Sequence, residues 1–166
     1  MNDKLAEVLR EAKVAWKIKK FANDEAYAQG TTFEVSEFAG NIMLNEGINE
    51  LWTLGCSSAG TLFDNSNAYL GVGDSNTAEA ATQTGLQAVT NKKYKAMTVG
   101  YPTYGTSQKA TWKATFGSTD ANFDWEEFTV ANGGSDASKN LNRKVSDQGT
   151  KVVGQTWELT LEITLS

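Results

Sequence analysis

Residues Thr156–Leu165 read TWELTLEITL, and apolar and polar side chains alternate through the whole stretch. Because successive side chains of a strand point to opposite faces, this pattern predicts a strand with one apolar and one polar face. The apolar face carries every second residue, namely Trp157, Leu159, Leu161, Ile163 and Leu165. Such a face needs a second layer of structure to cover it. The stretch therefore predicts a sheet packed on another layer.

Upstream of this strand, several runs show the same alternation and are separated by short turns. Strands are predicted at 67–73, 92–101, 108–116, 123–130 and 141–146, with a short extended piece at 151–153. The composition of fifteen Gly, one Pro and many Thr, Ser and Asn residues is typical of a turn-rich β protein. The predicted fold is mainly β, an antiparallel β-sandwich of jelly-roll or immunoglobulin-like type.

Two helices are predicted ahead of the strands. Residues 3–21 contain no Gly or Pro and place apolar residues at helical spacing: Leu5, Val8, Leu9, Ala12, Ala15 and Trp16. A second helix is predicted at 41–54, with a buried stripe of Ile42, Leu44, Ile48, Leu51 and Trp52. Residues 22–40 read as a connector with an extended piece at 32–35. The predicted domains are a helical arm and connector at 1–40 and a sandwich at 41–166, opened by the second helix.

Charge is distributed unevenly along the chain. The net charge is −5, yet residues 1–20 hold six basic and three acidic groups, a net +3, and the remainder carries −8. An acidic body argues against nucleic acid as a partner, because phosphates would repel it. No apolar run approaches the ~18 residues that a membrane helix needs, so no membrane partner is expected. The basic segment is either a solvated helix face or a surface that docks on an acidic protein.

The sequence offers little for catalysis. It has no histidine, which excludes Ser-His-Asp and Cys-His catalysis and the usual zinc sites, and Cys56 is its one cysteine. Residues 71–76 begin like a dinucleotide-binding loop but have Asn76 where the third glycine belongs. Residues 120–124 (DANFD) have the opening spacing of a calcium loop, but Trp125 replaces its glycine, so a turn explains them better.

Carboxylate pairs give no better case for an enzyme. Glu126 and Glu127 are neighbours on a strand and face opposite sides, whereas glycoside hydrolysis needs two carboxylates across a cleft. Glu158 and Glu162 share a face with threonines, which is typical of a solvated surface. The expectation is a protein that is not an enzyme and that has no cofactor and no metal.

Several segments in order resemble a widespread group of tailed-bacteriophage structural proteins. They are Tyr69–Asp74, Ala81–Leu86, Trp112–Phe116, Phe123–Phe128, Asn132–Gly134, Leu141–Val145 and Gly154–Leu161. The resemblance covers roughly residues 41–165 and leaves the N-terminal segment uncovered. It departs from the group's pattern at Glu127-Phe128-Thr129, where an aliphatic-glycine-valine ending is expected.

The resemblance implies a structural protein of the virion, made in the host cytoplasm, with no catalytic residues to carry over. The short, self-contained, acidic chain favours a capsid decoration (cement) protein that binds the major capsid protein as a homo-oligomer, such as a trimer. The alternatives are a tail, baseplate or fibre-associated protein, or a host-surface carbohydrate-binding module using Tyr101, Tyr104 and Trp125.

A docking surface is predicted on the basic N-terminal segment, which lies outside the resemblance. Trp16 is a rigid aromatic of the kind that dominates protein interfaces. The candidate interface residues are Leu5, Leu9, Lys13, Trp16, Lys17 and Lys20. They would dock either on the major capsid protein or on an adjacent copy of the chain. The alternative is that this segment covers the open end of its own sandwich.

Overall fold

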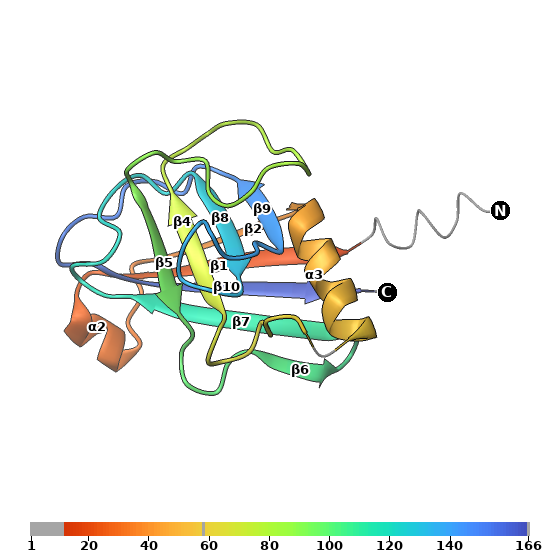
Figure 1. The fold of residues 1–166 in the computed structure, drawn as a ribbon. Coiled ribbons are helices and arrows are strands. Elements are labelled where there is room, and N and C mark those ends of the chain that lie inside the picture. The colour runs from red at the N-terminus through yellow and green to blue at the C-terminus, as the bar shows by residue number, and fades with distance from the viewer. Residues whose placement is uncertain (1–11, 58, 166) are drawn as a thin grey trace.

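The computed structural model describes residues 12–57 and 59–165 and shows a mainly β fold (Figure 1). In this part of the chain, ten strands form two antiparallel sheets, ordered β2-β1-β10-β7-β6 and β3-β9-β8-β4-β5. The strands are β1 Lys13–Phe21, β2 Glu34–Ala39, β3 Ile42–Met43, β4 Tyr69–Gly73, β5 Lys92–Ala96, β6 Thr103–Thr106, β7 Lys109–Phe116, β8 Glu127–Ala131, β9 Asn142–Val145 and β10 Thr156–Thr164. The helices are α2 Asp24–Gln29 and α3 Asn45–Cys56. The predicted antiparallel β-sandwich is confirmed.

The strand predicted from the alternating stretch is β10, at the centre of the first sheet. It pairs with β1 on one side and β7 on the other, so that Leu161 lies opposite both Trp16 and Trp112. Its apolar face is buried from Trp157 to Ile163. Leu165 is exposed because it follows the end of the strand, and Thr156 is buried although it lies on the polar face.

The helix predicted at 3–21 is wrong where the structure describes it, because Lys13–Phe21 is strand β1. Residues 3–11 lie outside the described part. Val14, Trp16 and Ile18 point into the core, and the strand pairs with β10 over its whole length. The pairing places a strand where the sequence spacing alone is compatible with a helix. The boundary at residue 40 is also wrong, since β1 and β2 belong to the first sheet.

The core lies between the two sheets and is rich in aromatic rings. Trp125, just before β8, sits at its centre and is fully buried. Its ring lies 4.8 Å from those of Phe116 and Trp157, measured between centroids, in edge-to-face geometry. Phe128 of β8 continues this cluster, because its ring lies 6.1 Å from that of Trp125 and 5.0 Å from that of Phe38 in β2. These contacts lock the two sheets together.

The short helix α2 stands where the sequence predicted a connector without a helix. The Asn23 side chain caps its start by accepting a hydrogen bond from Ala26 N at 2.8 Å. Gly30, with φ of 71°, ends it in the left-handed conformation that favours glycine. Neither described helix is long and apolar enough to span a membrane.

The second predicted helix is present as α3, but its burial differs from the prediction. Leu44, just before the helix, is buried, whereas Ile48, Leu51 and Trp52 are exposed. The reason is Gly47, which packs directly on the second sheet. A Cβ at this position would lie 2.3 Å from Leu141 Cα. The helix therefore packs on the sandwich through Gly47 and Leu54, and Ile48, Leu51 and Trp52 remain exposed among the described residues.

Alanine substitutions at the two glycines of α3 should have opposite effects. Gly47→Ala should lower the free energy of unfolding by about 1–3 kcal/mol, because the methyl group collides with the Leu141 backbone. Gly55→Ala, where a Cβ meets nothing within 4 Å, should raise it by about 0.5–1 kcal/mol, since alanine is the better helix former. Urea denaturation measures both values. Stabilisation by both variants would contradict this packing of α3.

Candidate interaction surfaces

The structure removes Trp16 from the predicted interface. Its side chain is 1% exposed, its ring stacks on Phe38, and its Nε1 donates a hydrogen bond to Gly40 O at 3.2 Å. Leu5 and Leu9 lie outside the described residues. Trp16 is therefore part of the domain's own core, and its role as an interface anchor was wrongly predicted.

The three lysines of the predicted interface differ in their burial and their position on β1. Lys20 is buried, pairs with Glu34 at 2.7 Å and lies 4.5 Å over the Trp157 ring, so it is a core residue and not an interface residue. Lys13 and Lys17 lie on the outward face of β1. Lys17 forms an exposed ion pair with Glu37 at 2.7 Å.

The outward face of the first sheet is polar, and its charges are largely matched. Glu158 lies 3.8 Å from Lys19 and 3.5 Å from Lys113, and Lys109 pairs with Glu162 at 3.0 Å. Two open hollows of about 540 and 600 Å³ lie over β1 and β2.

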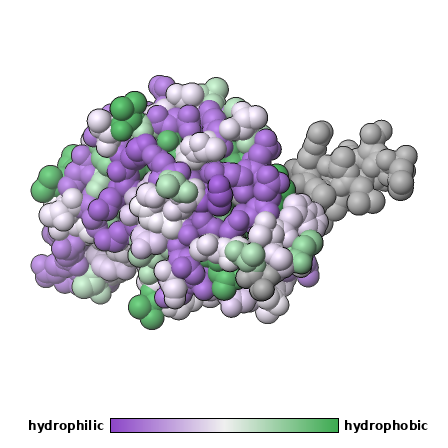
Figure 2. Space-filling view, viewed as in Figure 1, coloured by the Kyte–Doolittle hydropathy of each residue, from purple (hydrophilic) through white to green (hydrophobic). Residues whose placement is uncertain are grey.

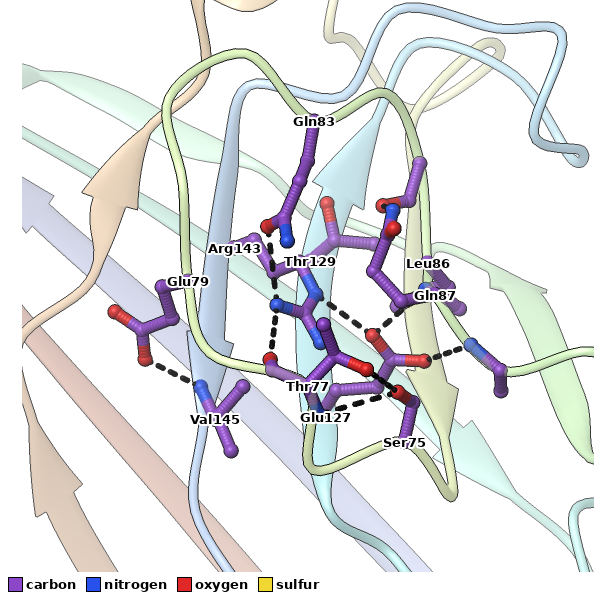
Figure 3. A network of polar contacts seen from close by, with 12 residues as sticks. Ser75, Thr77, Glu79, Gln83, Leu86, Gln87, Glu127, Thr129, Arg143 and Val145 are labelled. Carbon is purple, nitrogen blue, oxygen red and sulfur yellow. Dashed lines mark hydrogen bonds and ion pairs between the residues drawn. The ribbon is translucent and has the colours of Figure 1, made fainter.

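The most elaborate polar constellation in the described residues lies on the outer side of the second sheet (Figure 3). Glu127 of β8 and Arg143 of β9 are fully buried, and Arg143 Nε donates to Glu127 Oε2 at 2.7 Å. The Glu127 carboxylate also accepts hydrogen bonds from the backbone N–H groups of Gln87 at 2.9 Å and Ala88 at 2.7 Å. Both of its oxygens are thus used within the protein.

Arg143 binds the other side of the same loop. Its Nη1 donates to Thr77 O at 2.8 Å and to Gln83 Oε1 at 3.1 Å. Together the two side chains hold residues 74–91, which have no regular structure, over the sheet. All five residues of β8 are buried as a result, because the loop covers one face and the first sheet the other.

Two glycines of β4 leave room for the loop at 74–91 over the sheet. A Cβ at Gly73 would lie 2.4 Å from Glu127 Oε1 and 3.0 Å from Ala88 Cβ. At Gly71 it would meet Thr129 and the Tyr94 ring within 3.0 Å. The two glycines therefore permit the loop and its polar partners to lie close to the sheet.

A second group of polar side chains extends the constellation towards β5. The Tyr94 hydroxyl donates to Asp136 Oδ1 at 2.7 Å, and Lys92 pairs with the same carboxylate. Burial, and next the nearby Asp136 carboxylate, raise the pKa of Tyr94 well above its usual range. Two buried nitrogens, Asn142 Nδ2 and Arg143 Nη2, have no hydrogen-bond partner among the described residues.

Residues 120–124, which have the opening spacing of a calcium loop, form ion pairs and turns. Asp120 pairs with Lys95 at 2.6 Å, and Asn122 Oδ1 accepts a hydrogen bond from Lys151 Nζ at 2.8 Å. Asp124 accepts from the Thr150 hydroxyl. Across residues 12–57 and 59–165, no three His, Cys, Asp or Glu side chains gather as metal ligands would.

Lys151 gives the protein a pH dependence that can be measured. It is fully buried, and burial lowers its pKa to about 8. Between pH 8 and about 10.4, the ordinary value of lysine, the unfolded chain therefore binds more protons than the folded one. The free energy of unfolding should rise with pH in this window, by at most about 1.4 kcal/mol per pH unit.

The measurement is the difference in stability between the wild type and Lys151→Met at pH 7, 8 and 9. This difference isolates Lys151, because all other groups titrate in both proteins. It should shift in favour of the wild type as the pH rises. A difference that does not change with pH would contradict the lowered pKa.

The aromatic residues proposed for carbohydrate binding do not form one surface. Trp125 is fully buried, so its part in such a site was wrongly predicted. Tyr101 is half-buried, with Lys113 Nζ 4.8 Å above its ring. Only Tyr104 of these three is exposed, at 74%.

An uncovered apolar surface lies on α3, and we call it the α3 face. It comprises Ile48, Leu51 and Trp52, of which Trp52 is 60% exposed. Elsewhere the face seen in Figure 2 is mostly hydrophilic, with isolated hydrophobic residues. Several apolar residues grouped on one helix, including an exposed Trp, indicate a contact surface.

Sequence reasoning missed both the buried constellation and the α3 face. One available signal was a pair of opposite charges within predicted strands. Arg143 lies in the predicted strand at 141–146, and Glu127 lies in the aromatic strand at 123–130. The other signal was Gly47 in the middle of the predicted helix. A glycine there can indicate close packing against a neighbour as well as a lower helix propensity.

Comparison with known proteins found no matching family model, no matching curated protein and no matching solved structure. The function therefore has to be argued from the residues themselves.

Proposed function

We propose that the chain is a structural protein of a tailed-bacteriophage virion, and that it decorates the capsid by binding the major capsid protein. One observation carries the structural role. Polar residues within the phage-like segments, namely Gln83, Glu127 and Arg143, are used to fix the loop at 74–91 to the second sheet. Their side chains serve the fold, which is what a non-catalytic virion component requires of them.

The contact with the capsid is placed on the outward face of β1 and β2. Lys13 and Lys17 from the predicted interface lie there, and Val35 is opposite Lys19 in the strand pairing. Phe33 and Val35 are 52% and 47% exposed. The surface thus joins exposed apolar side chains to lysines and glutamates that pair with one another, such as Lys17 with Glu37, a combination that suits a polar and partly apolar partner surface.

A symmetric capsid offers many equivalent sites. Modest affinity per copy is then sufficient, particularly if the protein binds as a homo-oligomer whose subunits engage together. A tail, baseplate or fibre placement uses the same kind of surface and is separated from this one by location alone. The carbohydrate-binding alternative retains Tyr104 but loses Trp125.

The test is cosedimentation of the purified protein with capsids that lack it. Wild-type protein should bind to saturation at a stoichiometry set by the capsid symmetry. A double variant, Lys17→Glu with Val35→Asp, should bind at least tenfold more weakly. Lys139→Glu, an exposed lysine in the loop after β8, supplies a charge-reversal control and should bind normally. Failure of the wild type to bind would overturn the capsid placement.

A further inference from the structure

We propose that Lys151 and Asn122 are a site of covalent modification, at which the lysine amine attacks the asparagine carboxamide and an isopeptide bond forms within one chain. Lys151 Nζ donates a hydrogen bond to Asn122 Oδ1 at 2.8 Å, so the amine already contacts the group that it would attack. The inference goes beyond the capsid placement and does not depend on it.

The backbone holds the two residues side by side. Asp124 and Thr150 form an antiparallel bridge, and Lys151 N donates a hydrogen bond to Phe123 O at 3.1 Å. The segment that carries Lys151 therefore runs directly beside the segment that carries Asn122. Two groups that a folded chain keeps in contact react as though each were present at a very high concentration.

Hydrogen bonds to the backbone fix both side chains. Lys151 Nζ also donates to Gly117 O at 2.8 Å, in the turn that follows β7. Asn122 Nδ2 donates to Ser118 O at 3.1 Å, in the same turn. The amine and the carboxamide thus keep their relative position without the help of a partner molecule.

The surroundings of Lys151 favour the reactive form of its amine, because only a neutral amine is a nucleophile. The side chain is fully buried, and burial lowers its pKa to about 8. The carboxylates of Asp120 and Asp24 act in the opposite direction and raise the pKa, and Asp120 is itself paired with Lys95 at 2.6 Å. Freshly prepared protein at pH 7 therefore holds mainly the charged, unlinked amine, to which the pH dependence described above applies. Above pH 8 the neutral amine is the main form.

The step balances without an oxidant, a reductant or a further reactant. The lone pair of Lys151 Nζ attacks Asn122 Cγ, a new bond forms between these two atoms, and the bond from Cγ to Nδ2 breaks. Nδ2 leaves as ammonia and takes the proton that Nζ gives up. The product joins the turn after β7 to the segment before β10, and such a cross-link restricts the unfolded chain.

The test is the mass of the intact protein, followed during incubation of freshly purified full chain at pH 9 and at pH 6. At pH 9 the mass should fall by that of one ammonia molecule, and a tryptic digest should contain a branched peptide that joins Lys151 to Asn122. At pH 6 the loss should be at least tenfold slower, because little of the amine is neutral. A mass that stays at the value of the sequence after prolonged incubation at pH 9 would overturn the proposal.

Two variants separate this reaction from ring closure of Asn122 onto its own backbone, which also releases ammonia. Lys151→Arg keeps the positive charge but has no reactive amine, so it should lose no ammonia from Asn122. Lys139→Arg changes an exposed lysine and should react as the wild type does. The wild type unfolded in urea at pH 9 should form no branched peptide, because the two residues are then apart. Loss of ammonia from Asn122 in Lys151→Arg at the wild-type rate, or a branched peptide from the unfolded chain, would contradict a reaction built into the fold.

Discussion

Glu127→Gln should lower the free energy of unfolding by about 3–5 kcal/mol, a large share of the stability of a domain of this size. The substitution removes the charge that balances Arg143, and both side chains are fully buried. A buried cation without its partner is far more costly than a broken surface pair. The Glu127→Gln substitution also weakens the acceptor for the N–H groups of Gln87 and Ala88.

Two comparisons make this prediction specific. Glu37→Gln breaks an exposed ion pair with Lys17 and should change stability little, because water screens that pair. Combining Glu127→Gln with Arg143→Met should recover part of the loss, since no charge is then left unpaired. Additive losses in the double variant would contradict the pairing. Hydrogen exchange at Gln87 and Ala88 should become faster in Glu127→Gln.

Leu161→Ala should cost about 2–5 kcal/mol of stability, because it leaves a cavity at the centre of the sandwich. Leu161 is fully buried and lies on β10 between Trp16 and Trp112 in the strand pairing. The surrounding aromatic rings are held by both sheets and cannot collapse fully into the space.

The neighbouring residue is the matched control for Leu161. Glu162→Ala removes a half-exposed carboxylate that pairs with Lys109 and should cost about 0–1 kcal/mol. Denaturant melts of the two variants give the comparison. Equal losses would mean that the alternation in β10 does not determine burial.

The sequence predicted β10 well and β1 badly, although both alternate. In β10 the buried positions from Trp157 to Ile163 are all large and apolar, so the period is unmistakable. In β1 the alternation of Val14, Trp16 and Ile18 ends at Lys20, a charged residue in a buried position. Lys20 is tolerated there by its ion pair with Glu34 and by the Trp157 ring, contacts that only the folded structure supplies.

The candidate sites depend still more on tertiary structure. The sequence predicts Glu126 and Glu127 on opposite faces of a strand and gives no sign that Glu127 is buried. Its burial results from the loop at 74–91, and no local pattern indicates where that loop lies. The exposed stripe of α3 likewise follows from Gly47 packing on Leu141, a contact between residues distant in sequence.

The most direct test of the proposed function is the location of the protein in the virus particle. Purified particles should be labelled with antibody fragments against the chain and imaged by electron microscopy. A capsid decoration protein predicts label over the whole capsid exterior, in a pattern that follows the capsid symmetry. Label confined to the tail, or particles that lack the protein altogether, would contradict the account.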